Sequence, residues 1–283
     1  MRPLYAPSQV AELLRRYRLS PDRAFGQNFL IDRAVLAATI EAAGIGASDS
    51  VLEVGPGLGV LTRELAAGAG AVTAIEADPR LLPALTETLG GVANVELICG
   101  DALTFEMKRL PAGSLFISNP PYNLATPILR RVLESGRFRR AVVLLQREVA
   151  DRLVARPGSR SYGALSLVRE HYGAAERIRD VPPSCFLPPP GVTSSLVRLD
   201  LRPGVRVDPA LFELIRDAFR HRRKTLTGNL VRAGHPKAVV RSALEAAGID
   251  ERARAEELAL AEFRNLAEQL YTCSDRPPRN RLY

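Results

Sequence analysis

The chain has 283 residues, of which 46% are apolar and 25% are charged, and its formal net charge is +8. This length suits one large domain or a large domain with a small one, and the core needs no disulfide bonds. Cys99, Cys185 and Cys273 are far apart in the sequence, which argues against a disulfide framework and a zinc site, so we expect no metal. No apolar run suits a signal peptide or a membrane span, so we expect a cytoplasmic protein. The basic charge fits a nucleic-acid partner or an unspecialised basic enzyme equally well.

Strands and helices alternate through the first half of the chain. Two helices are expected first, at 8–17 with Ser8 as N-cap and at 34–43 ending at Gly44. The elements that follow are strand 51–54, helix 58–67, strand 71–75, helix 79–89 and strands 95–99, 114–118 and 141–145. Strands separated by helices predict an α/β fold, with a Rossmann-like parallel sheet that is covered on both faces.

The second half of the chain changes character at a proline-rich segment. Five of the ten residues in 181–190 are proline, which predicts an extended loop and excludes a helix or a central strand. A last strand is expected at 194–201, and Pro203-Gly204 marks a boundary. Beyond it we expect three helices. The first begins at Pro209 and is capped by Asp208, and the other two cover 238–247 and 255–270. The sequence therefore predicts a domain over 1–204 and a small all-helical domain over 205–283.

A glycine-rich turn, Glu53-Val54-Gly55-Pro56-Gly57-Leu58-Gly59, follows the first predicted strand and opens a helix. Such a turn lets backbone N–H groups approach a ligand closely. Glu76 closes the next strand, where a carboxylate accepts hydrogen bonds from ribose hydroxyls. Val60 stands where the dinucleotide fingerprint needs Gly or Ala, which favours S-adenosylmethionine over a nicotinamide cofactor. Asp101-Ala102, after the third strand, supports this because a carboxylate there can reach an adenine amine, although a lone Asp at such a place is more often a helix cap.

A second motif, Asn119-Pro120-Pro121-Tyr122, follows the strand at 114–118, and ligands of α/β sheets bind at such strand ends. The exocyclic amine of adenine is a poor nucleophile because its lone pair is delocalised into the ring. The Asn119 side-chain oxygen and the Pro120 carbonyl are suited to accept its two N–H groups and localise that lone pair. Tyr122 offers a face on which the base can stack. These residues predict methylation of an adenine amine.

With these motifs, nearly the whole chain resembles the KsgA/Dim1 family of ribosomal RNA adenine N6,N6-dimethyltransferases, and within it the bacterial small-subunit enzymes. Residues 25–30 (FGQNFL) resemble the family's N-terminal donor motif, which would make Gln27, Asn28 and Leu30 donor contacts. The resemblance extends the donor set to Gly55, Gly57, Glu76, Asp101 and Asn119. Phe186, with Pro188 and Pro190, resembles the family's F-x-P-x-P loop, whose ring stacks on the target adenine. The resemblance implies a Rossmann-like methyltransferase that uses S-adenosylmethionine. Its catalytic residues would be Asn119, Pro120, Tyr122 and Phe186.

Three residues depart from the family pattern. Pro120 stands where the family usually has an aliphatic residue, and Asn-Pro-Pro-Tyr is common in DNA adenine methyltransferases. Gly191 and Thr193 stand where the family usually has Lys and Asp. Proline keeps its carbonyl, so the departures bear on the shape of the target loop rather than on the reaction.

Basic residues cluster at the end of the first helix of the predicted small domain, in a segment that resembles a family motif. They are Arg220, Arg222, Arg223 and Lys224. Such a run is usually a solvated face or a complement to the helix dipole, but beside an RNA-modifying site phosphate contact is the better interpretation. The resemblance implies that this domain docks a pre-ribosomal particle, so we expect small-subunit ribosomal RNA as the partner of a monomer without a membrane partner.

The leading hypothesis is dimethylation of two adjacent adenosines in a hairpin loop of 16S ribosomal RNA during ribosome biogenesis. A large-subunit RNA methyltransferase and a DNA adenine methyltransferase are the alternatives that share the chemistry. The length leaves no room for a long DNA target-recognition domain, which counts against the second. A non-catalytic ribosome-assembly factor is the alternative of a different class.

Overall fold

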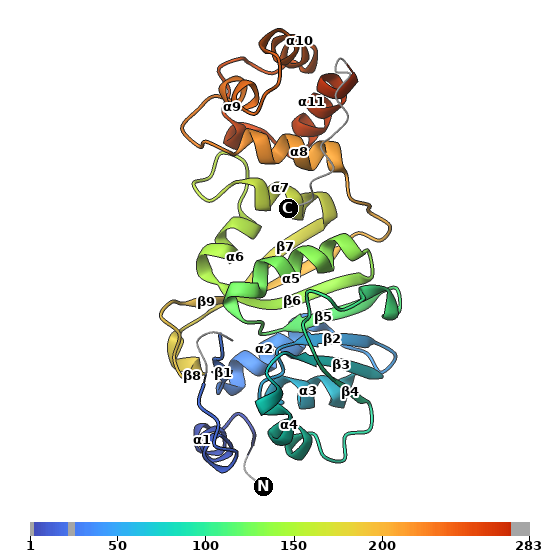
Figure 1. Ribbon diagram of the computed structural model, residues 1–283, viewed down its shortest axis with the longest axis vertical. Coiled ribbons are helices and arrows are strands. Elements are labelled where there is room, and N and C mark those ends of the chain that lie inside the picture. The colour runs from blue at the N-terminus through green and yellow to red at the C-terminus, as the bar shows by residue number, and fades with distance from the viewer. Residues whose placement is uncertain (1–2, 22–25, 273–283) are drawn as a thin grey trace. The chain divides into compact units, whose positions relative to one another are not determined.

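A computed structural model of the protein describes residues 3–21 and 26–272 (Figure 1). The chain divides into two compact units. The first comprises Met1–Ala150 and Ala174–Gly204, and the second comprises Asp151–Gly173 and Val205–Tyr283. The first unit thus ends where Pro203-Gly204 indicates a boundary, but residues 151–173 group with the second unit, although the sequence analysis assigned them to the first domain.

A seven-stranded sheet forms the centre of the first unit. Its strands are β2 (Ser50–Val54), β3 (Ala71–Glu76), β4 (Val95–Cys99), β5 (Ser114–Ser118), β6 (Phe138–Gln146), β7 (Gly173–Val181) and β9 (Ser194–Leu201). They lie in the order β4-β3-β2-β5-β6-β9-β7. Neighbours from β4 to β6 are parallel, whereas β9 is antiparallel to β6. The carboxyl ends of the parallel strands therefore share one edge of the sheet, and β9 begins at that same edge.

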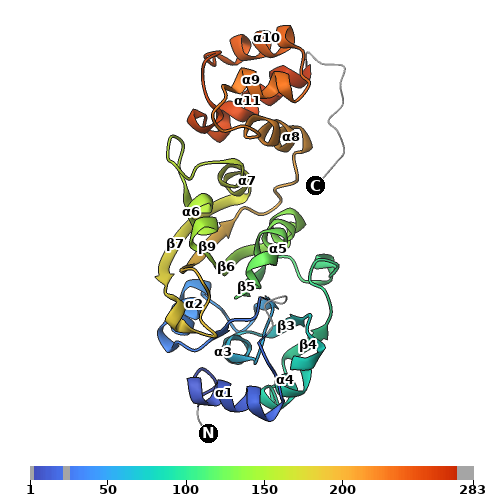
Figure 2. The ribbon, with the colours of Figure 1, turned by 60° about the vertical axis from the view of Figure 1, so that its left-hand side comes forward.

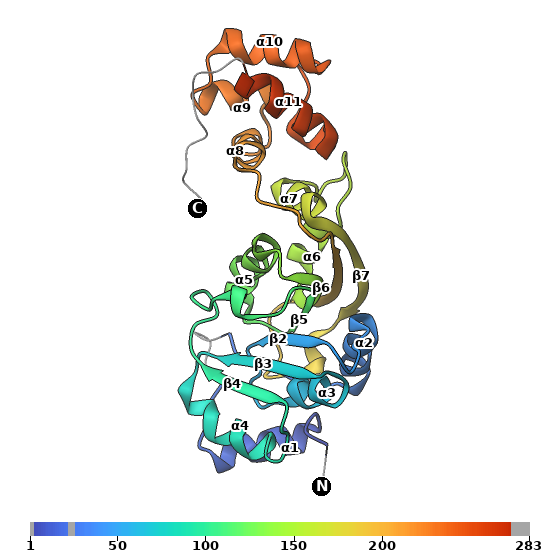
Figure 3. The same ribbon diagram turned by 90° about the vertical axis from the view of Figure 1, so that its right-hand side faces the viewer.

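Helices cover both faces of this sheet. They are α1 (Pro7–Arg16), α2 (Arg33–Ala43), α3 (Val60–Gly68), α4 (Leu82–Thr88) and α5 (Tyr122–Ser135), followed by α6 (Arg147–Val154), which spans the boundary between the units. Figure 3 shows α2 and α3 on one side of the strands and α5 on the other. Figures 2 and 3 both show α1 beside α4, where Leu13 and Leu85 share a buried cluster.

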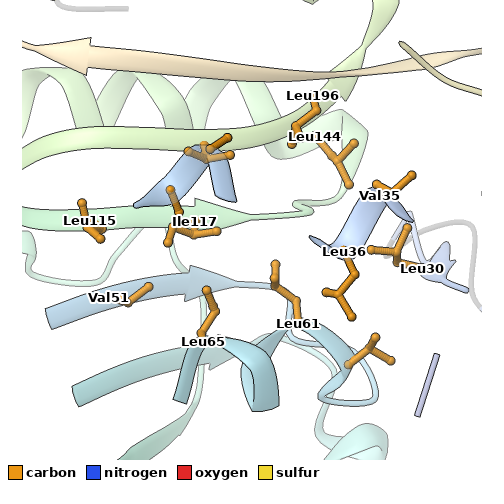
Figure 4. Close-up of a cluster of buried hydrophobic side chains, with 14 of the residues drawn as sticks. Leu30, Val35, Leu36, Val51, Leu61, Leu65, Leu115, Ile117, Leu144 and Leu196 are labelled. Carbon is orange, nitrogen blue, oxygen red and sulfur yellow. The ribbon is translucent and has the colours of Figure 1, made fainter. Parts of the chain in front are cut away.

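The strands at the centre of the sheet are buried on both faces. All five residues of β5 are buried, as expected for a parallel strand that helices cover on each side. Figure 4 shows Leu115 and Ile117 of β5 in one apolar cluster with Leu36 of α2 and Leu61 of α3. This packing holds β2 and β5 side by side, which fixes the separation of the loops that leave their carboxyl ends.

The predicted α/β sheet is confirmed, with two local differences. The N-cap of α1 is Ala6 and not Ser8, because Pro7 takes the first helical position, where its missing N–H costs no hydrogen bond. Strand β7 was not predicted. It lies at the edge of the sheet and carries charged residues over 176–180, which obscure the apolar alternation that identifies a strand.

The proline-rich segment contains no helix longer than a single 3₁₀ turn, Pro183–Cys185, and no central strand, as predicted. It does contain the two-residue strand β8 (Phe186–Leu187), which pairs with β1 (Phe29–Leu30) in an antiparallel ribbon. The peptide bond between Leu187 and Pro188 is cis. The ribbon joins the segment around residues 26–30 to the start of the 188–193 loop, a contact between distant parts of the chain that the sequence did not indicate.

The second unit is helical. Its elements are α7 (Ala164–Tyr172), α8 (Pro209–Ala218), α9 (Leu226–Arg232), α10 (Lys237–Ala247) and α11 (Leu260–Thr272). Asp208 caps α8 as predicted, since its Oδ1 accepts from the Leu211 N–H at 3.0 Å. Residues 151–173 belong here because Leu167 shares the buried core of α8 and α11, and because the Tyr162 hydroxyl donates to the Leu258 carbonyl at 3.0 Å.

Within the described residues, no helix combines the length and the apolar character that crossing a membrane requires. The same residues contain no group of three or more His, Cys, Asp or Glu side chains that could hold a metal ion.

Candidate functional site

A pocket opens at the carboxyl ends of β2, β3 and β5. It encloses about 580 Å³ of non-protein space, including its open mouth. The residues that line it come from segment 26–30, the glycine turn, the strand ends and loop 119–122: Gly26, Gln27, Asn28, Phe29, Leu30, Glu53, Gly55, Pro56, Gly57, Leu58, Val60, Leu61, Glu76, Leu81, Asn119 and Pro121. The predicted donor-site residues therefore meet at one pocket, with the exception of Asp101 and Ala102.

The glycine turn brings its backbone to the pocket in a form that only glycine adopts easily. Gly55 and Gly57 have φ angles of 72° and 61°, in the left-handed region. A Cβ on Gly57 would lie 3.1 Å from the Phe29 ring, and one on Gly55 would lie 3.3 Å from Pro121 Cδ. The turn is thus confined between segment 26–30 and loop 119–122. A side chain at Gly57 would displace segment 26–30, and one at Gly55 would displace loop 119–122.

Glu76 at the end of β3 is held by backbone N–H groups on both carboxylate oxygens. Oε1 accepts from the Asp78 N–H at 2.9 Å, and Oε2 accepts from the Gly57 N–H at 3.2 Å. Burial raises the pKa of Glu76, although these backbone hydrogen bonds oppose the rise. Gln27 is tied to the same corner, since its Nε2 donates to Asp78 Oδ2 at 2.7 Å. Each carboxylate oxygen keeps acceptor capacity for a ligand hydroxyl.

Glu53 is a site residue that the sequence analysis did not select. Its side chain is 1% exposed and lines the pocket, and its Oε2 has no hydrogen-bond partner among the described residues. Burial raises the pKa of Glu53 to about 8, and the nearby Glu76 carboxylate adds to the rise. A hydrogen bond with Thr62 opposes this rise. A buried carboxyl with an unpartnered oxygen suits a cationic ligand, because an ammonium or sulfonium group would supply the missing counter-charge. A single acidic residue inside the apolar strand Val51–Val54 is the signal that could have identified it.

Loop 119–122, the predicted catalytic loop, lies directly against segment 26–30. The Asn119 side-chain Nδ2 donates to the Asn28 carbonyl at 3.2 Å, which leaves the Asn119 Oδ1 to act as an acceptor. A Cβ on Gly26 would lie 3.2 Å from Pro121 Cβ, so the two backbones are in close contact. The Ser118 hydroxyl donates to the Val54 carbonyl at 2.7 Å and ties the ends of β5 and β2 together. These contacts fix the Asn119 amide at the edge of the pocket.

Tyr122 follows at the first position of α5 and is half-buried. Its hydroxyl shares a hydrogen bond with the Ser194 hydroxyl, with 2.5 Å between the oxygens. Burial raises the pKa of Tyr122, so the phenol is neutral at ordinary pH. Pro120, which follows Asn119 in the sequence, is buried.

Five of the predicted site residues of the first unit do not line the pocket: Asp101, Ala102, Pro120, Tyr122 and Phe186. Asp101 is exposed, and its Oδ1 accepts from the Leu103 N–H at 2.8 Å, which is the capping role weighed against a ligand role. It lies near the pocket, because the preceding Gly100 N–H donates to the Glu76 carbonyl at 2.8 Å, but neither Asp101 nor Ala102 lines it. Phe186 is 2% exposed inside the apolar cluster of α2 and β5, so it presents no ring face for a base. The stacking role that the resemblance implies for Phe186 stays a prediction, and it requires the ring to leave this cluster.

The predicted basic residues form an exposed loop in the second unit, between α8 and α9. All four, Arg220, Arg222, Arg223 and Lys224, are exposed. Arg222 is engaged within the unit, where its guanidinium pairs with Glu256 at 3.2 Å and donates to the Arg160 carbonyl. Phe25, the first residue of the predicted N-terminal donor motif, lies outside the described residues.

The sheet order, with the glycine turn and the Asn-Pro-Pro-Tyr loop at neighbouring strand ends, gives the first unit the architecture of a Rossmann-like S-adenosylmethionine-dependent methyltransferase. A sequence profile described as "Ribosomal RNA adenine dimethylase" matches residues 19–271. The chain belongs to the ribosomal RNA adenine dimethylase family.

Several relatives match along nearly the full length of the chain. The Ribosomal RNA small subunit methyltransferase A of Deinococcus radiodurans is 46% identical over 269 residues, which cover 95% of this chain and 92% of the relative. The protein of the same name from Pelotomaculum thermopropionicum is 42% identical, covering 93% and 96%. Among solved structures, a dimethyladenosine transferase from Plasmodium falciparum superimposes with a TM-score of 0.76 and 26% identity, covering 86% of this chain and 98% of that chain. The 23S rRNA methyltransferase ErmE superimposes with a TM-score of 0.68 and 31% identity, covering 86% and 100%.

Proposed function

We propose that this protein transfers methyl groups from S-adenosylmethionine to the N6 amines of two adjacent adenosines in a hairpin loop of 16S ribosomal RNA, giving N6,N6-dimethyladenosine during ribosome biogenesis. The observation that carries this proposal is the position of Asn119. Its Nδ2 is engaged by the Asn28 carbonyl at 3.2 Å, so its Oδ1 is available at the edge of the pocket to accept from an adenine amine. The curated relatives named small subunit methyltransferase A, at 38–46% identity, support the choice of target.

The pocket suits the methyl donor on both charge and shape. S-adenosylmethionine, when bound, supplies an electrophilic methyl group on a sulfonium. Glu76, held by the Gly57 and Asp78 N–H groups, is placed to accept from ribose hydroxyls. The unpartnered Oε2 of Glu53 fits the positive charge of the methionine part. Segment 26–30 lies over the glycine turn, with Phe29 against Gly57, and would exclude water from the bound donor.

The catalytic loop supplies acceptors rather than a strong base. Asn119 Oδ1 and the Pro120 carbonyl accept the two N–H groups of the target amine, which favours a pyramidal nitrogen with a localised lone pair. Tyr122 presents its ring to the base. As the N–C bond forms, the bond from sulfur to the methyl carbon breaks, and the amine proton passes to water. Because the Asn119 amide is already fixed by Asn28, positioning accounts for most of the rate.

The RNA reaches this site as a loop whose base is already partly unstacked, which lowers the cost of splaying it out. In this proposal Arg220, Arg223 and Lys224 contact phosphates of the pre-ribosomal small subunit. The protein acts as a monomer in the cytoplasm. Asp101 lies near the Glu76 end of the pocket. Its side chain would contact S-adenosylmethionine if it left the Leu103 N–H.

The structural likeness to ErmE favours a second candidate, methylation of large-subunit RNA. It shares every step above and differs only in the RNA that docks. The Deinococcus radiodurans relative covers more of this chain at higher identity, 95% at 46% against 86% at 31%, which is why the small subunit is preferred.

The test is transfer of labelled methyl groups from S-adenosylmethionine to undermethylated small ribosomal subunits, with large subunits and DNA in parallel, followed by nucleoside analysis. We expect N6,N6-dimethyladenosine on the small subunit alone. Label on large subunits or on DNA would overturn the substrate and keep the mechanism. No label anywhere, with the donor still bound, would overturn the catalytic proposal in favour of an assembly factor.

A further inference from the structure

The hydroxyl of Tyr122 contacts a serine from a distant part of the chain. Tyr122 begins α5 directly after the Asn-Pro-Pro sequence, and Ser194 begins β9. Their hydroxyl oxygens are 2.5 Å apart, so they share a hydrogen bond across 72 residues of sequence. Ser194 is 0% exposed, so water does not compete for its hydroxyl.

The sheet brings this serine to the catalytic loop. In the antiparallel pairing of β6 and β9, Ser194 lies opposite Gln146, the last residue of β6. In the parallel pairing of β5 and β6, Ser118 lies opposite Val143, near the same end. Strand β9 therefore begins at the edge where Asn119 and the rest of the catalytic loop leave β5.

The hydrogen bond fixes the tyrosine ring at both ends. The backbone of Tyr122 is held in the first turn of α5, and its hydroxyl is held by the buried Ser194. A tyrosine side chain has only two torsions, and holding its Cβ and hydroxyl ends fixes the direction of the ring axis. Because the phenol O–H prefers the ring plane, the hydrogen bond to Ser194 also favours one rotation of the ring about that axis. A ring that is already ordered loses little entropy when a flat base packs on it.

Ser195 offers an internal comparison. It is also 0% exposed, but successive side chains of a strand point to opposite faces. Its hydroxyl donates to Asp180 Oδ1 at 2.6 Å, which joins β9 to β7 rather than to the catalytic loop. The two serines thus lie side by side in β9 and are equally buried, and they differ only in the hydrogen-bond partner of the hydroxyl.

We propose that Ser194 is a positioning residue that acts through the Tyr122 hydroxyl and holds the ring in the plane that packs against the target adenine. This inference rests on the proposed function, which supplies the adenine. It adds a residue to the target side that is not part of the Asn-Pro-Pro-Tyr motif.

The kinetic test uses undermethylated small subunits at saturating donor and compares Ser194→Ala, Tyr122→Phe, the double variant and Ser195→Ala. We expect Ser194→Ala and Tyr122→Phe each to lower kcat/KM for the subunits about five- to tenfold, the equivalent of one neutral hydrogen bond. The double variant should be no slower than either single variant, because both remove the same contact. The KM for the donor should stay within about twofold, and Ser195→Ala should match the wild type in rate even if its thermal stability falls.

A second readout does not depend on catalysis. In protein labelled with ¹³C-tyrosine, the Tyr122 resonance is the one missing from Tyr122→Phe. Its hydroxyl should titrate at higher pH in Ser194→Ala, since the Ser194 hydrogen bond lowers the pKa of Tyr122, and should be unchanged in Ser195→Ala. An unchanged Tyr122 resonance in Ser194→Ala, or rate losses that multiply in the double variant, would overturn the inference. A wild type that transfers no methyl group would overturn the proposed function instead, and the resonance would still decide whether Ser194 holds the ring.

Discussion

The donor side and the target side of the pocket are built differently. On the donor side, the ligand-facing groups come from the short turn 55–59 and from Glu76 at the next strand end, and backbone N–H groups hold them. On the target side, Asn119 is held by Asn28, Tyr122 by Ser194, and Phe186 is packed into the core. The turn and Glu76, at the centre of the donor side, are therefore close in sequence, and segment 26–30 covers them. The target side depends on side chains that meet only in the folded chain.

This difference separates two kinds of failure. Damage to the donor side should change donor binding, because the backbone itself is the binding surface. Damage to the target side should leave donor binding intact and reduce the rate or the affinity for RNA. Donor affinity and reaction rate, measured separately, therefore tell which side a substitution has damaged.

The largest expected effect is on the target side. Asn119→Ala removes the side-chain oxygen that we propose accepts from the amine, and kcat should fall by roughly 10²–10³-fold, as for the loss of one preorganised hydrogen-bonding group. Donor affinity, measured by calorimetry with S-adenosylhomocysteine, should change by less than about threefold, because one edge contact of the pocket is lost while Glu53 and Glu76 remain.

The matched control for this change is Asn123→Ala, an exposed asparagine in the first turn of α5. It should retain wild-type kcat. Equal losses in the two variants would mean that the loop tolerates no substitution and that Asn119 has no special role in the reaction.

Gly57→Ala should act on the donor side. The added Cβ would lie 3.1 Å from the Phe29 ring at a φ of 61°, so either the turn or segment 26–30 must move. We expect donor affinity to fall about ten- to a hundredfold, measured by the same calorimetry. Gly91→Ala is the control for backbone strain alone, since Gly91 has a φ of 82° and its Cβ would meet nothing within 4 Å. If Gly91→Ala weakened the donor equally, strain rather than contact would be the cause.

The same contrast explains what the sequence could predict. The turn 55–59 and Glu76 were identified because a glycine-rich turn after a strand has one geometry, and the pocket contains them as expected. The partners of Tyr122 and Phe186 were not identified, because Ser194 of β9 reaches Tyr122, and β1 reaches Phe186, only through long-range pairing. For Asp101 the sequence left a ligand role and a capping role open, and in the structure its side chain accepts from the Leu103 N–H, a local hydrogen bond that a short polar side chain makes readily.

Glu53 links the pocket to protein stability. The unfolded chain ionises Glu53 near its ordinary pKa of 4.5, whereas burial raises the pKa in the folded protein to about 8. The folded state therefore binds the proton more tightly, and stability falls as pH rises from about 4.5 to 8. Glu53→Gln should remove this loss and raise the unfolding free energy of the ligand-free protein at pH 8 by on the order of 2 kcal/mol.

Urea unfolding at pH 5 and pH 8 measures the effect, and Glu64→Gln, on the exposed face of α3, is the control. The gain in Glu53→Gln should be present at pH 8 and absent at pH 5, and the control should show no such difference. A gain of equal size at both pH values would indicate better packing of the amide, not removal of a buried charge.

The smallest expected effect lies in the basic loop of the second unit, where charge rather than shape decides binding. Among the described residues, Arg223 and Lys224 have no acidic partner, whereas Arg222 pairs with Glu256 at 3.2 Å. Each phosphate contact that is lost should lower the slope of log affinity against log salt by about 1. Arg223→Ala with Lys224→Ala should therefore weaken RNA binding several-fold at low salt and flatten its salt dependence. Arg222→Ala should weaken RNA binding less, because Glu256 already neutralises that guanidinium.

The test is filter binding of small-subunit RNA to these variants across a salt series. Equal slopes in all variants would mean that the loop is only a solvated face. A larger change in Arg222→Ala would mean that its ion pair opens on the RNA.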